Sequence, residues 1–242
     1  MKVRIFETHE ELSSFVAGEI LDTVRQKPDA LLTLATGDTP LLTYKKLVQR
    51  SRDEKVDWSA VKFAALDEWV GVPAENPGSC KSFLEENIFK QIPFQKQNIH
   101  LFDVQSGDLS GECALMDGFI KTHGPVDLML VGIGVNGHIG FNEPGVSGDL
   151  YSHVIDLEST TKSVGQKYFP SEIVLSQGIT LGFRHILEAK RVIVIANGSH
   201  KAKIIDVSLH GKITNDVPAT LLRKHEGALF ASDGDAAKFL NT

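Results

Sequence analysis

The sequence predicts an α/β protein whose sheet is doubly wound and mostly parallel, with helices on both faces. Short, almost continuously apolar runs alternate with segments of helical periodicity along the whole chain. Strands that are apolar on both faces are typical of parallel sheets covered on both sides. The 242 residues are 42% hydrophobic and 23% charged, which suffices for one domain with a full core. We therefore expect a single, Rossmann-like domain that spans residues 1–242.

Each expected strand is a short run rich in β-branched or other apolar residues. These runs are Val3–Phe6, Ala30–Ala35, Val61–Leu66, Ile99–Phe102, Val126–Val131, Val154–Leu157, Arg191–Ala196 and Ala228–Ala231. The first helix is expected after Thr8, because Thr8 and Glu11 have the spacing of a capping box and apolar residues then recur every four positions. Further helices are expected from Pro40, from about Ser79, and over residues 110–122, 171–188, 199–210 and 234–240.

Charge, cysteine content and hydropathy exclude several classes of function. The 25 basic and 31 acidic residues give a net charge of −6, so we expect no nucleic-acid partner. No run of about 18 apolar residues and no signal peptide is present, so we expect no membrane partner and a cytoplasmic location. Cys80 and Cys113 are far apart, and no two histidines have H-x-x-x-H spacing, so we expect neither a disulfide framework nor a metal site.

Polar residues follow four of the expected strands. They are Thr36–Thr39, Asp67 with Glu68, Gly132–His138 and Asn197–Lys201. Because ligands bind beyond the carboxyl ends of parallel strands, we expect these four segments to meet at one rim of the sheet.

The turn Thr36-Gly37-Asp38-Thr39 is a candidate anion site between a strand and a helix. Free backbone N–H groups and the helix dipole attract anions there, Gly37 permits close approach, and Thr39 is a candidate N-cap and hydroxyl donor. Asp38 opposes an anion unless its side chain points outward. Lys201 would add a positive charge. Taken alone, the turn could be an ordinary capped turn and Lys201 a surface lysine.

Residues Gly132–Gly137 match the pattern G-x-G-x-x-G, and Asp156 follows at about the distance of a ribose-binding carboxylate. A dinucleotide fingerprint must open a helix, however, and Gly140 and Pro144 prevent a helix here. The sequence therefore argues against a dinucleotide cofactor.

The same glycine-rich loop contains a candidate acid–base pair. His138 is close in sequence to Glu143 and Asn136, and a histidine beside a carboxylate is a common acid–base arrangement. Asp67 ends an apolar strand, where partial desolvation is expected to raise its pKa toward that of a general base. The alternatives are a hydrogen-bonded structural loop for His138 and a capping role for Asp67.

Four stretches together resemble the glucosamine-6-phosphate deaminase family, the isomerising amino-sugar-phosphate deaminases. They are Ala35–Pro40 (ATGDTP), Leu66–Gly71 (LDEWVG), Gly132–Pro144 (GIGVNGHIGFNEP) and Gly198–Ala202 (GSHKA). The resemblance covers nearly the whole chain, and the related 6-phosphogluconolactonases share the fold but lack the FNEP ending. Five segments are more similar to the galactosamine-6-phosphate isomerase/deaminase branch of the family. They are Lys27–Ala30, Thr39–Tyr44, Leu66–Trp69, Pro77–Cys80 and Gly178–Gly182.

The resemblance implies the fold of this family and the isomerising deamination of a hexosamine 6-phosphate. Galactosamine 6-phosphate would give tagatose 6-phosphate, or glucosamine 6-phosphate would give fructose 6-phosphate, with release of ammonia and without a cofactor or metal. Lactone hydrolysis on the same fold, and a sugar-phosphate-binding regulator without catalysis, are the alternatives. Monomer and homo-oligomer both remain open.

The resemblance also implies roles for individual residues. Asp67 would move the C2 proton, and His138 would accept the ring hydroxyl proton with support from Glu143 and Asn136. The remaining implied residues would bind the phosphate. They are Thr36, Gly37, Asp38, Thr39, Lys167 and Lys201.

Overall fold

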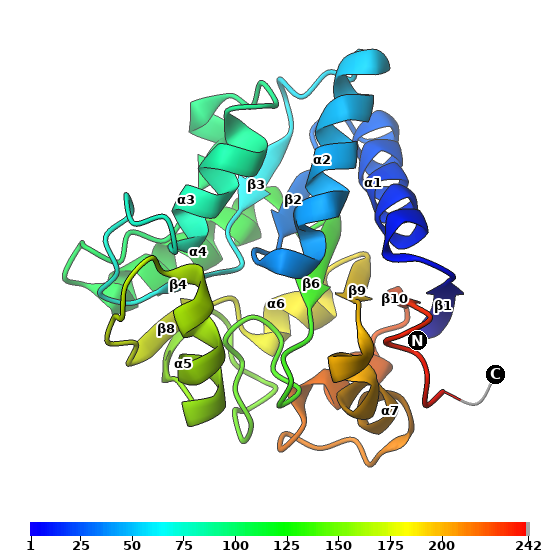
Figure 1. Cartoon of the computed structure of the whole chain (residues 1–242). Helices are drawn as coiled ribbons and strands as arrows, with labels where there is room; N and C mark the ends of the chain where they lie inside the picture. The colour runs from blue at the N-terminus through cyan, green and yellow to red at the C-terminus, as the bar shows by residue number, and fades with distance from the viewer. Residues whose placement is uncertain (241–242) are drawn as a thin grey trace.

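The computed structural model describes residues 1–240, in which a seven-stranded parallel sheet lies beside a three-stranded antiparallel sheet (Figure 1). The order of the large sheet is β1-β10-β9-β6-β2-β3-β5. Its strands are β1 (Lys2–Phe6), β2 (Leu31–Leu34), β3 (Lys62–Ala64), β5 (Ile99–His100), β6 (Leu128–Gly132), β9 (Val192–Ala196) and β10 (Ala228–Asp233). The predicted α/β fold with a mostly parallel sheet is confirmed. Residues 241 and 242, the last two of the expected domain, lie outside the described part.

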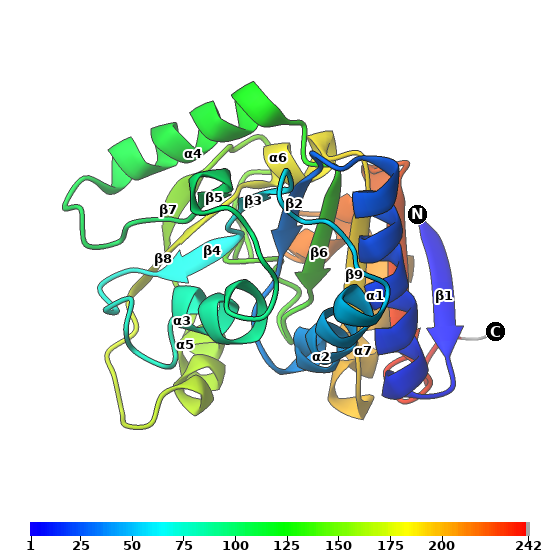
Figure 2. The same ribbon diagram turned by 90° about the horizontal axis from the view of Figure 1, so that it is seen from above.

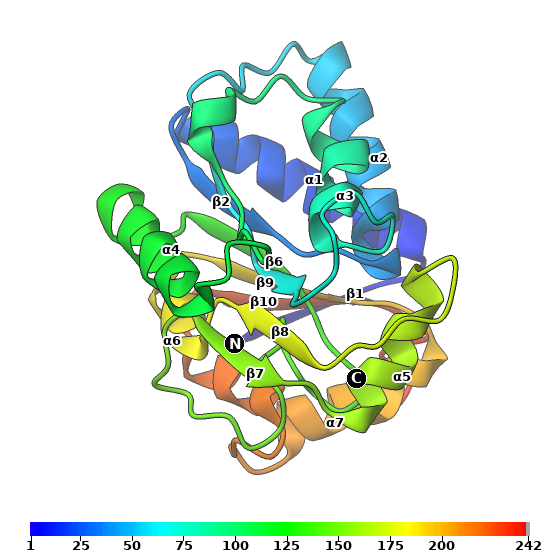
Figure 3. The same cartoon turned by 90° about the vertical axis from the view of Figure 1, so that its left-hand side faces the viewer.

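Helices cover both faces of the large sheet, as Figure 3 shows with α1 and α2 on one side and α6 and α7 on the other. The α-helices are α1 (His9–Gln26), α2 (Asp38–Asp53), α3 (Cys80–Leu84), α4 (Leu109–His123), α5 (Ser159–Gly165), α6 (Phe183–Glu188) and α7 (Ala202–His210). Shorter helical turns are η1 (Glu85–Phe89), η2 (Lys96–Asn98), η3 (Gln166–Tyr168), η4 (Ser199–Lys201) and η5 (Pro218–Lys224). Among residues 1–240, no helix is both long and apolar enough to cross a bilayer.

Helix α1 begins where its capping signal predicts. The Thr8 hydroxyl accepts a hydrogen bond from the Glu11 N–H at 3.1 Å, which satisfies one of the free donors of the first turn. The apolar residues spaced four apart, from Leu12 to Val24, face the core and are almost fully buried. Helix α2 begins two residues earlier than expected, with Gly37 rather than Thr39 as its N-cap. The Thr39 hydroxyl instead donates to Asn197 Oδ1 at 2.8 Å, so a contact distant in sequence decides this boundary.

The three-stranded sheet was not predicted. It consists of β4 (Asp67–Trp69), β8 (Gln177–Thr180) and β7 (His153–Asp156), in the order β4-β8-β7. In Figures 1 and 2 it lies toward the edge of the molecule opposite β1.

Two expected helices are wrong. Only Phe183–Glu188 is helical within residues 171–188, because Gln177–Thr180 pairs with β4 on one side and β7 on the other. Residues 234–240 form turns rather than a helix. The Asp233 carboxylate accepts the Ala236 N–H at 2.8 Å and so caps the first of these turns, and the segment is too short to sustain a helix alone.

The sheet order brings the polar segments together. Strands β9, β6 and β2 are neighbours, with Gly132 opposite Ile195 and Leu130 opposite Leu34. The loops that follow their carboxyl ends therefore meet at one rim, as expected. Strand β3 lies on the other side of β2 and continues through Leu66 to Asp67 at the start of β4, which adds the fourth segment.

Candidate active site

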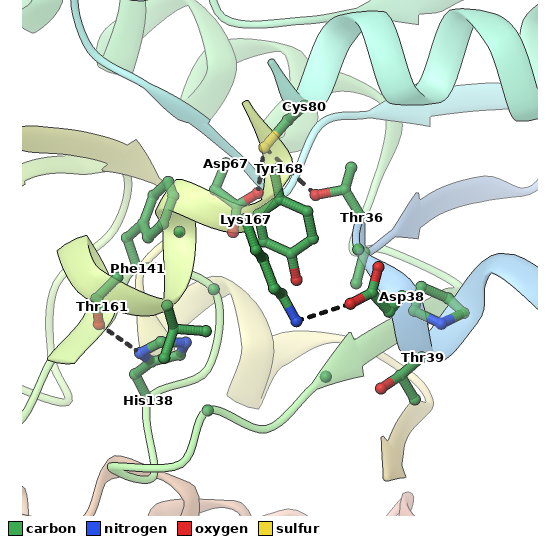
Figure 4. A pocket seen from close by; sticks show the side chains of 18 of the residues that line it. Thr36, Asp38, Thr39, Asp67, Cys80, His138, Phe141, Thr161, Lys167 and Tyr168 are labelled. Atoms are coloured by element: carbon green, nitrogen blue, oxygen red, sulfur yellow. Dashed lines mark hydrogen bonds and ion pairs between the residues drawn. The ribbon is translucent and has the colours of Figure 1, made fainter. Parts of the chain in front are cut away.

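A cavity of about 620 Å³ opens at this rim, a size typical of small-molecule sites (Figure 4). Of the site residues selected from the sequence, those that line it are Thr36–Thr39, Asp67, His138, Lys167 and Lys201. Asn136 and Glu143 do not line the cavity and instead contact His138 from behind. The sequence therefore selected side chains that the fold does bring together.

Asp67 is the first residue of β4 and lies opposite Thr180 of β8. Its side chain is buried, and desolvation by burial raises its pKa to about 7. A hydrogen bond from the Cys80 thiol, whose Sγ is 3.4 Å from Asp67 Oδ1, lowers this pKa, and the charge of Glu68 raises it. A carboxylate with a pKa near neutrality is suited to take up and return a proton.

Glu68 points away from Asp67, as successive residues of a strand do. Its carboxylate accepts backbone N–H groups of Cys80 at 2.9 Å and Lys81 at 2.7 Å, and so fixes the start of α3 against β4. Burial raises the pKa of Glu68, and these hydrogen bonds oppose that shift. Glu68 thus has a structural role beside the cavity rather than a place in its lining.

His138 is held through its Nδ1 atom, which is 3.0 Å from Thr161 Oγ1 and 3.4 Å from Glu143 Oε2. The Asn136 amide donates to Glu143 Oε2 at 3.0 Å, and Asn136 Oδ1 accepts the His138 N–H at 3.2 Å. Gly134 permits this arrangement, because a Cβ there would lie 2.5 Å from the imidazole ring. The Nε2 atom makes no hydrogen bond to any of residues 1–240, so it is free to meet a ligand.

Glu143 is buried but is held in its charged form. Burial raises its pKa, yet hydrogen bonds and the charge of His138, with further hydrogen bonds from Thr161 and Asn136, bring it below its usual range. A charged carboxylate behind the imidazole stabilises the protonated form of His138 when that side chain accepts a proton.

The candidate anion site lies at the N-terminus of α2. Gly37 has a φ of +105°, a conformation that favours glycine, and the following backbone N–H groups begin the helix beside the cavity. Lys201 reaches the same region from η4 and donates to the Ile133 carbonyl at 2.6 Å. Burial, together with the charge of Lys167, lowers the pKa of Lys201 to about 8. Such a desolvated cation would gain strongly from an anionic partner.

Lys167 and Asp38 form an ion pair at the mouth of the cavity, with Lys167 Nζ 2.7 Å from Asp38 Oδ2. Both side chains are at least half exposed. Tyr168, the next residue of η3, lies against Gly37, where a Cβ would be 3.0 Å from the tyrosine hydroxyl oxygen. The segment α5–η3 therefore covers the candidate anion site.

Sequence reasoning missed several residues of the site. Thr161 and Tyr168 come from the covering segment, Asn197 holds Thr39, and Cys80 contacts Asp67. Only Cys80 and Asn197 had a signal in the sequence, since they belong to the selected stretches Pro77–Cys80 and Asn197–Lys201. Within residues 1–240, no group of three or more His, Cys, Asp or Glu side chains is arranged to hold a metal ion.

The fold and the site together define an α/β protein equipped for acid–base chemistry on a small anionic molecule. A family model described as "Glucosamine-6-phosphate isomerases/6-phosphogluconolactonase" matches residues 6–231, and the chain belongs to this family of enzymes. Within the family, it is similar over its full length to proteins named glucosamine-6-phosphate deaminase. The protein of Clostridium botulinum (strain Alaska E43 / Type E3) is 38% identical over 242 residues, which cover 100% of this chain and 97% of that protein.

Further comparisons agree with this assignment. The glucosamine-6-phosphate deaminase of Clostridium perfringens (strain 13 / Type A) is 36% identical over 241 residues, covering 99% of this chain and 100% of the relative. The solved structure of a monomeric glucosamine-6-phosphate deaminase has a TM-score of 0.95 at 35% identity, with 98% of this chain and 99% of that chain covered. A 6-phosphogluconolactonase from Trypanosoma brucei, at 22% identity and a TM-score of 0.79 over 99% of this chain and 98% of that one, shares the fold. The family resemblance found in the sequence is confirmed.

Proposed function

We propose that the protein catalyses the isomerising deamination of a hexosamine 6-phosphate, which releases ammonia and leaves a ketose 6-phosphate. The observation that carries this proposal is one cavity lined by Asp67, by His138 with Glu143 behind it, and by a helix N-terminus with Lys201 beside it. The full-length similarity to proteins named glucosamine-6-phosphate deaminase supports the same reaction.

The phosphate binds at the anion site. Backbone N–H groups of Gly37–Thr39 donate to its oxygens, and so does the Thr39 hydroxyl once it leaves Asn197 Oδ1. Lys201 supplies a charge-assisted hydrogen bond from the buried side. Lys167 adds a second positive charge once it leaves Asp38. Thr36, at the end of the preceding strand, lines the wall between the phosphate and Asp67.

His138 opens the sugar ring. Its Nε2 atom accepts the proton of the ring hydroxyl while the C1–O5 bond breaks, which produces the open-chain aldehyde and returns a proton to O5. The charged Glu143 stabilises the imidazolium formed in between. Asn136 does not titrate and instead fixes Glu143 and the backbone of His138.

Asp67 then transfers the proton. The C1 carbonyl acidifies the hydrogen on C2, so the carboxylate can remove it to give an enolamine and return it to C1, which leaves an imine at C2. Water adds to the imine and ammonia leaves, so the balance is hexosamine 6-phosphate plus water to ketose 6-phosphate plus ammonia. The substrate's own carbonyl acts as the electron acceptor, and the reaction needs no cofactor or metal.

Galactosamine 6-phosphate is the preferred substrate in this proposal. The support is the similarity of five segments to the galactosamine branch, three of which contribute to the lining of the cavity. They are Thr39–Tyr44, through Thr39 and Pro40, Leu66–Trp69, through Leu66, Asp67 and Trp69, and Pro77–Cys80. The epimers differ only at the C4 hydroxyl, and a site built to pair one hydroxyl rejects the other arrangement by several kcal/mol, roughly 10⁴-fold or more in favourable cases.

The proposal also covers the setting of the reaction. Residues 1–242 form one domain that acts in the cytoplasm, without a nucleic-acid or membrane partner. The substrate is a charged small molecule that does not cross a bilayer unaided. In support, the site combines segments from both halves of the chain, from Thr36 to Lys201.

Ammonia release from galactosamine 6-phosphate and from glucosamine 6-phosphate, measured side by side, tests the function. We expect a higher kcat/KM on the galactosamine epimer, and Asp67→Asn serves as the inactive control. Equal or greater efficiency on glucosamine 6-phosphate would reject the epimer assignment and retain the reaction. Hydrolysis of 6-phosphogluconolactone, without ammonia release from either hexosamine 6-phosphate, would establish the lactonase alternative. Binding of these three compounds without turnover of any of them would establish the regulator.

A further inference from the structure

Cys80 connects the two sides of the cavity wall through its thiol. The Thr36 hydroxyl donates to Cys80 Sγ at 3.3 Å, and Sγ in turn donates to Asp67 Oδ1 at 3.4 Å (Figure 4). The three side chains come from segments 13 to 44 residues apart in the chain, so the fold alone assembles this series.

Among residues 1–240, Cys80 is the one side chain that donates a hydrogen bond to Asp67. The Thr180 hydroxyl, opposite Asp67 on β8, donates to the backbone carbonyls of Leu66 and Leu181 instead. Asp67 Oδ2 accepts no hydrogen bond from the described residues and lies on the side of Gly140, where a Cβ would be 3.3 Å from it. Gly140 lines the cavity, so the unpaired oxygen is the one beside the substrate space.

Cys80 is itself held in place. It is the first residue of α3, its N–H donates to Glu68 Oε1 at 2.9 Å, and the preceding Ser79 caps the helix by accepting the Ser82 N–H. Burial, with the charges of Glu68 and Asp67, raises the pKa of the Cys80 thiol well above its usual range. The thiol therefore stays protonated and acts as a donor rather than as a nucleophile.

We propose that Cys80 is a positioning residue for Asp67: the series Thr36–Cys80–Asp67 fixes Oδ1 and thereby presents Oδ2 to the substrate carbon atoms. This inference rests on the proposed role of Asp67 as the base. A thiol suits the task because it is a weak donor, which orients a carboxylate while withdrawing little of its basicity. A hydroxyl in the same place would bind the charged carboxylate more strongly and make it a weaker base.

Few ionisable groups act on Asp67. The ionisable groups that act on it are Glu68 on β4, Tyr44 on α2 and Cys80 on α3. Burial raises the pKa of the Tyr44 hydroxyl well above its usual range, so Tyr44 stays neutral near pH 7. The Cys80 thiol also lowers the pKa of Glu68, so the effect of a change at Cys80 must be measured on the Asp67 carboxyl itself.

The test compares Cys80→Ala and Cys80→Ser, with Cys113→Ala as the matched control. Cys113 is the other buried free thiol, on α4, and does not line the cavity. Loss of the donor in Cys80→Ala should move the acid limb of the kcat/KM profile to higher pH by about half a unit, the equivalent of one hydrogen bond. Cys80→Ser should move the limb in the opposite direction, KM should stay within about twofold in both, and Cys113→Ala should match wild type.

A ¹³C NMR titration of the Asp67 carboxyl, assigned by the signal that Asp67→Asn lacks, reads the same shifts without turnover. If wild type releases no ammonia, the proposed function fails, and the titration still decides whether Cys80 acts on Asp67. Shifts in opposite directions for alanine and serine support the proposal. Titrations within about 0.2 pH unit of wild type, or shifts of one sign in both variants, overturn it. If Cys80→Ala does not fold, the direction of the Cys80→Ser shift decides alone.

Discussion

Lys167 Nζ lies 2.7 Å from a carboxylate oxygen of Asp38, so one of the two lysines at the candidate phosphate site is bound to an anion of the protein itself. Asp38 is the first residue of α2 and Lys167 belongs to η3, so the pair joins the candidate phosphate site to the segment that covers it. A phosphate that binds to Lys167 must compete with this carboxylate for the positive charge of the lysine.

Replacing Asp38 by asparagine should therefore strengthen substrate binding. The change frees Lys167 and removes a negative charge beside the phosphate. An exposed ion pair contributes about 0.2–1 kcal/mol, so we expect KM to fall by about 1.4- to 5-fold at low salt, with a smaller effect at high salt. Asp53→Asn, at the far end of the same helix, has the same change of net charge and serves as the control. A rise in KM for Asp38→Asn would show that the carboxylate assists binding.

Lys201→Ala should weaken substrate binding far more. Lys201 is mostly buried beside the N-terminus of α2, and loss of a charge-assisted hydrogen bond costs roughly 1.5–3 kcal/mol, or about 10- to 150-fold in KM. Lys203→Ala, an exposed lysine two residues further along the chain, should leave KM unchanged. Steady-state kinetics of both variants decide the point, and an unaltered KM in Lys201→Ala would remove this lysine from the phosphate site.

The KM of the wild-type protein should rise in alkaline solution. Burial lowers the pKa of Lys201 to about 8, so the side chain is protonated and able to bind phosphate below that pH and loses its proton above it. KM should be nearly constant up to about pH 7, should about double by pH 8, and should then increase up to tenfold per pH unit. Lys201→Arg keeps its charge and should show a flat profile over the same range. The same alkaline rise in the arginine variant would assign the titration to another group.

Asp67→Asn should abolish turnover without abolishing binding. The amide keeps the shape of the side chain but cannot take up the C2 proton, and a positioned base contributes about 10²–10⁴-fold to the rate. Deamination should fall by at least about a hundredfold, while the Kd for the substrate changes little. In heavy water, the reverse reaction from a ketose 6-phosphate and ammonium should place deuterium in the sugar with wild type only. A variant that deaminates at nearly the wild-type rate would exclude Asp67 as the base.

Thr161→Val should impair ring opening through His138. The Thr161 hydroxyl is 3.0 Å from His138 Nδ1, and valine keeps its shape without the hydrogen bond. We expect kcat to fall by about 2- to 10-fold, the value of one hydrogen bond, with KM nearly unchanged. Ser163→Ala, on the exposed side of the same helix, should match wild type. An open-chain substrate analogue, which bypasses ring opening, should bind equally to both variants, and weaker binding to Thr161→Val would indicate a wider disturbance of α5.

The sequence predicted those parts of the site that depend on local signals. Thr36–Thr39, Asp67 and His138 follow apolar strands directly, and the order of parallel strands brings such segments to one rim. Lys201 was recognised because it follows a fourth strand in the same way.

Contacts between distant segments could not be predicted. Residues 177–180 form a strand because they pair with β7 and with β4, which lies about 110 residues earlier in the chain. No local sequence pattern predicts that pairing. The partner of Asp38 lies 129 residues further along the chain. The thiol of Cys80 reaches Asp67 because α3 begins beside β4, where Glu68 accepts the Cys80 N–H.

The segment that covers the cavity begins and ends at one place in the structure. Asp156 at the end of β7 lies opposite Gln177 at the start of β8, so residues 157–176 leave the small sheet and return to it at adjoining positions. This excursion carries Thr161, Lys167 and Tyr168, whereas Asp67 and Lys201 belong to the framework around it. Both ends of the segment are thus fixed by one pair of neighbouring strands of the small sheet, apart from the seven-stranded sheet. Asp67 therefore does not depend on this segment for its place in the chain, whereas the ring-opening residue His138 is held by it through Thr161.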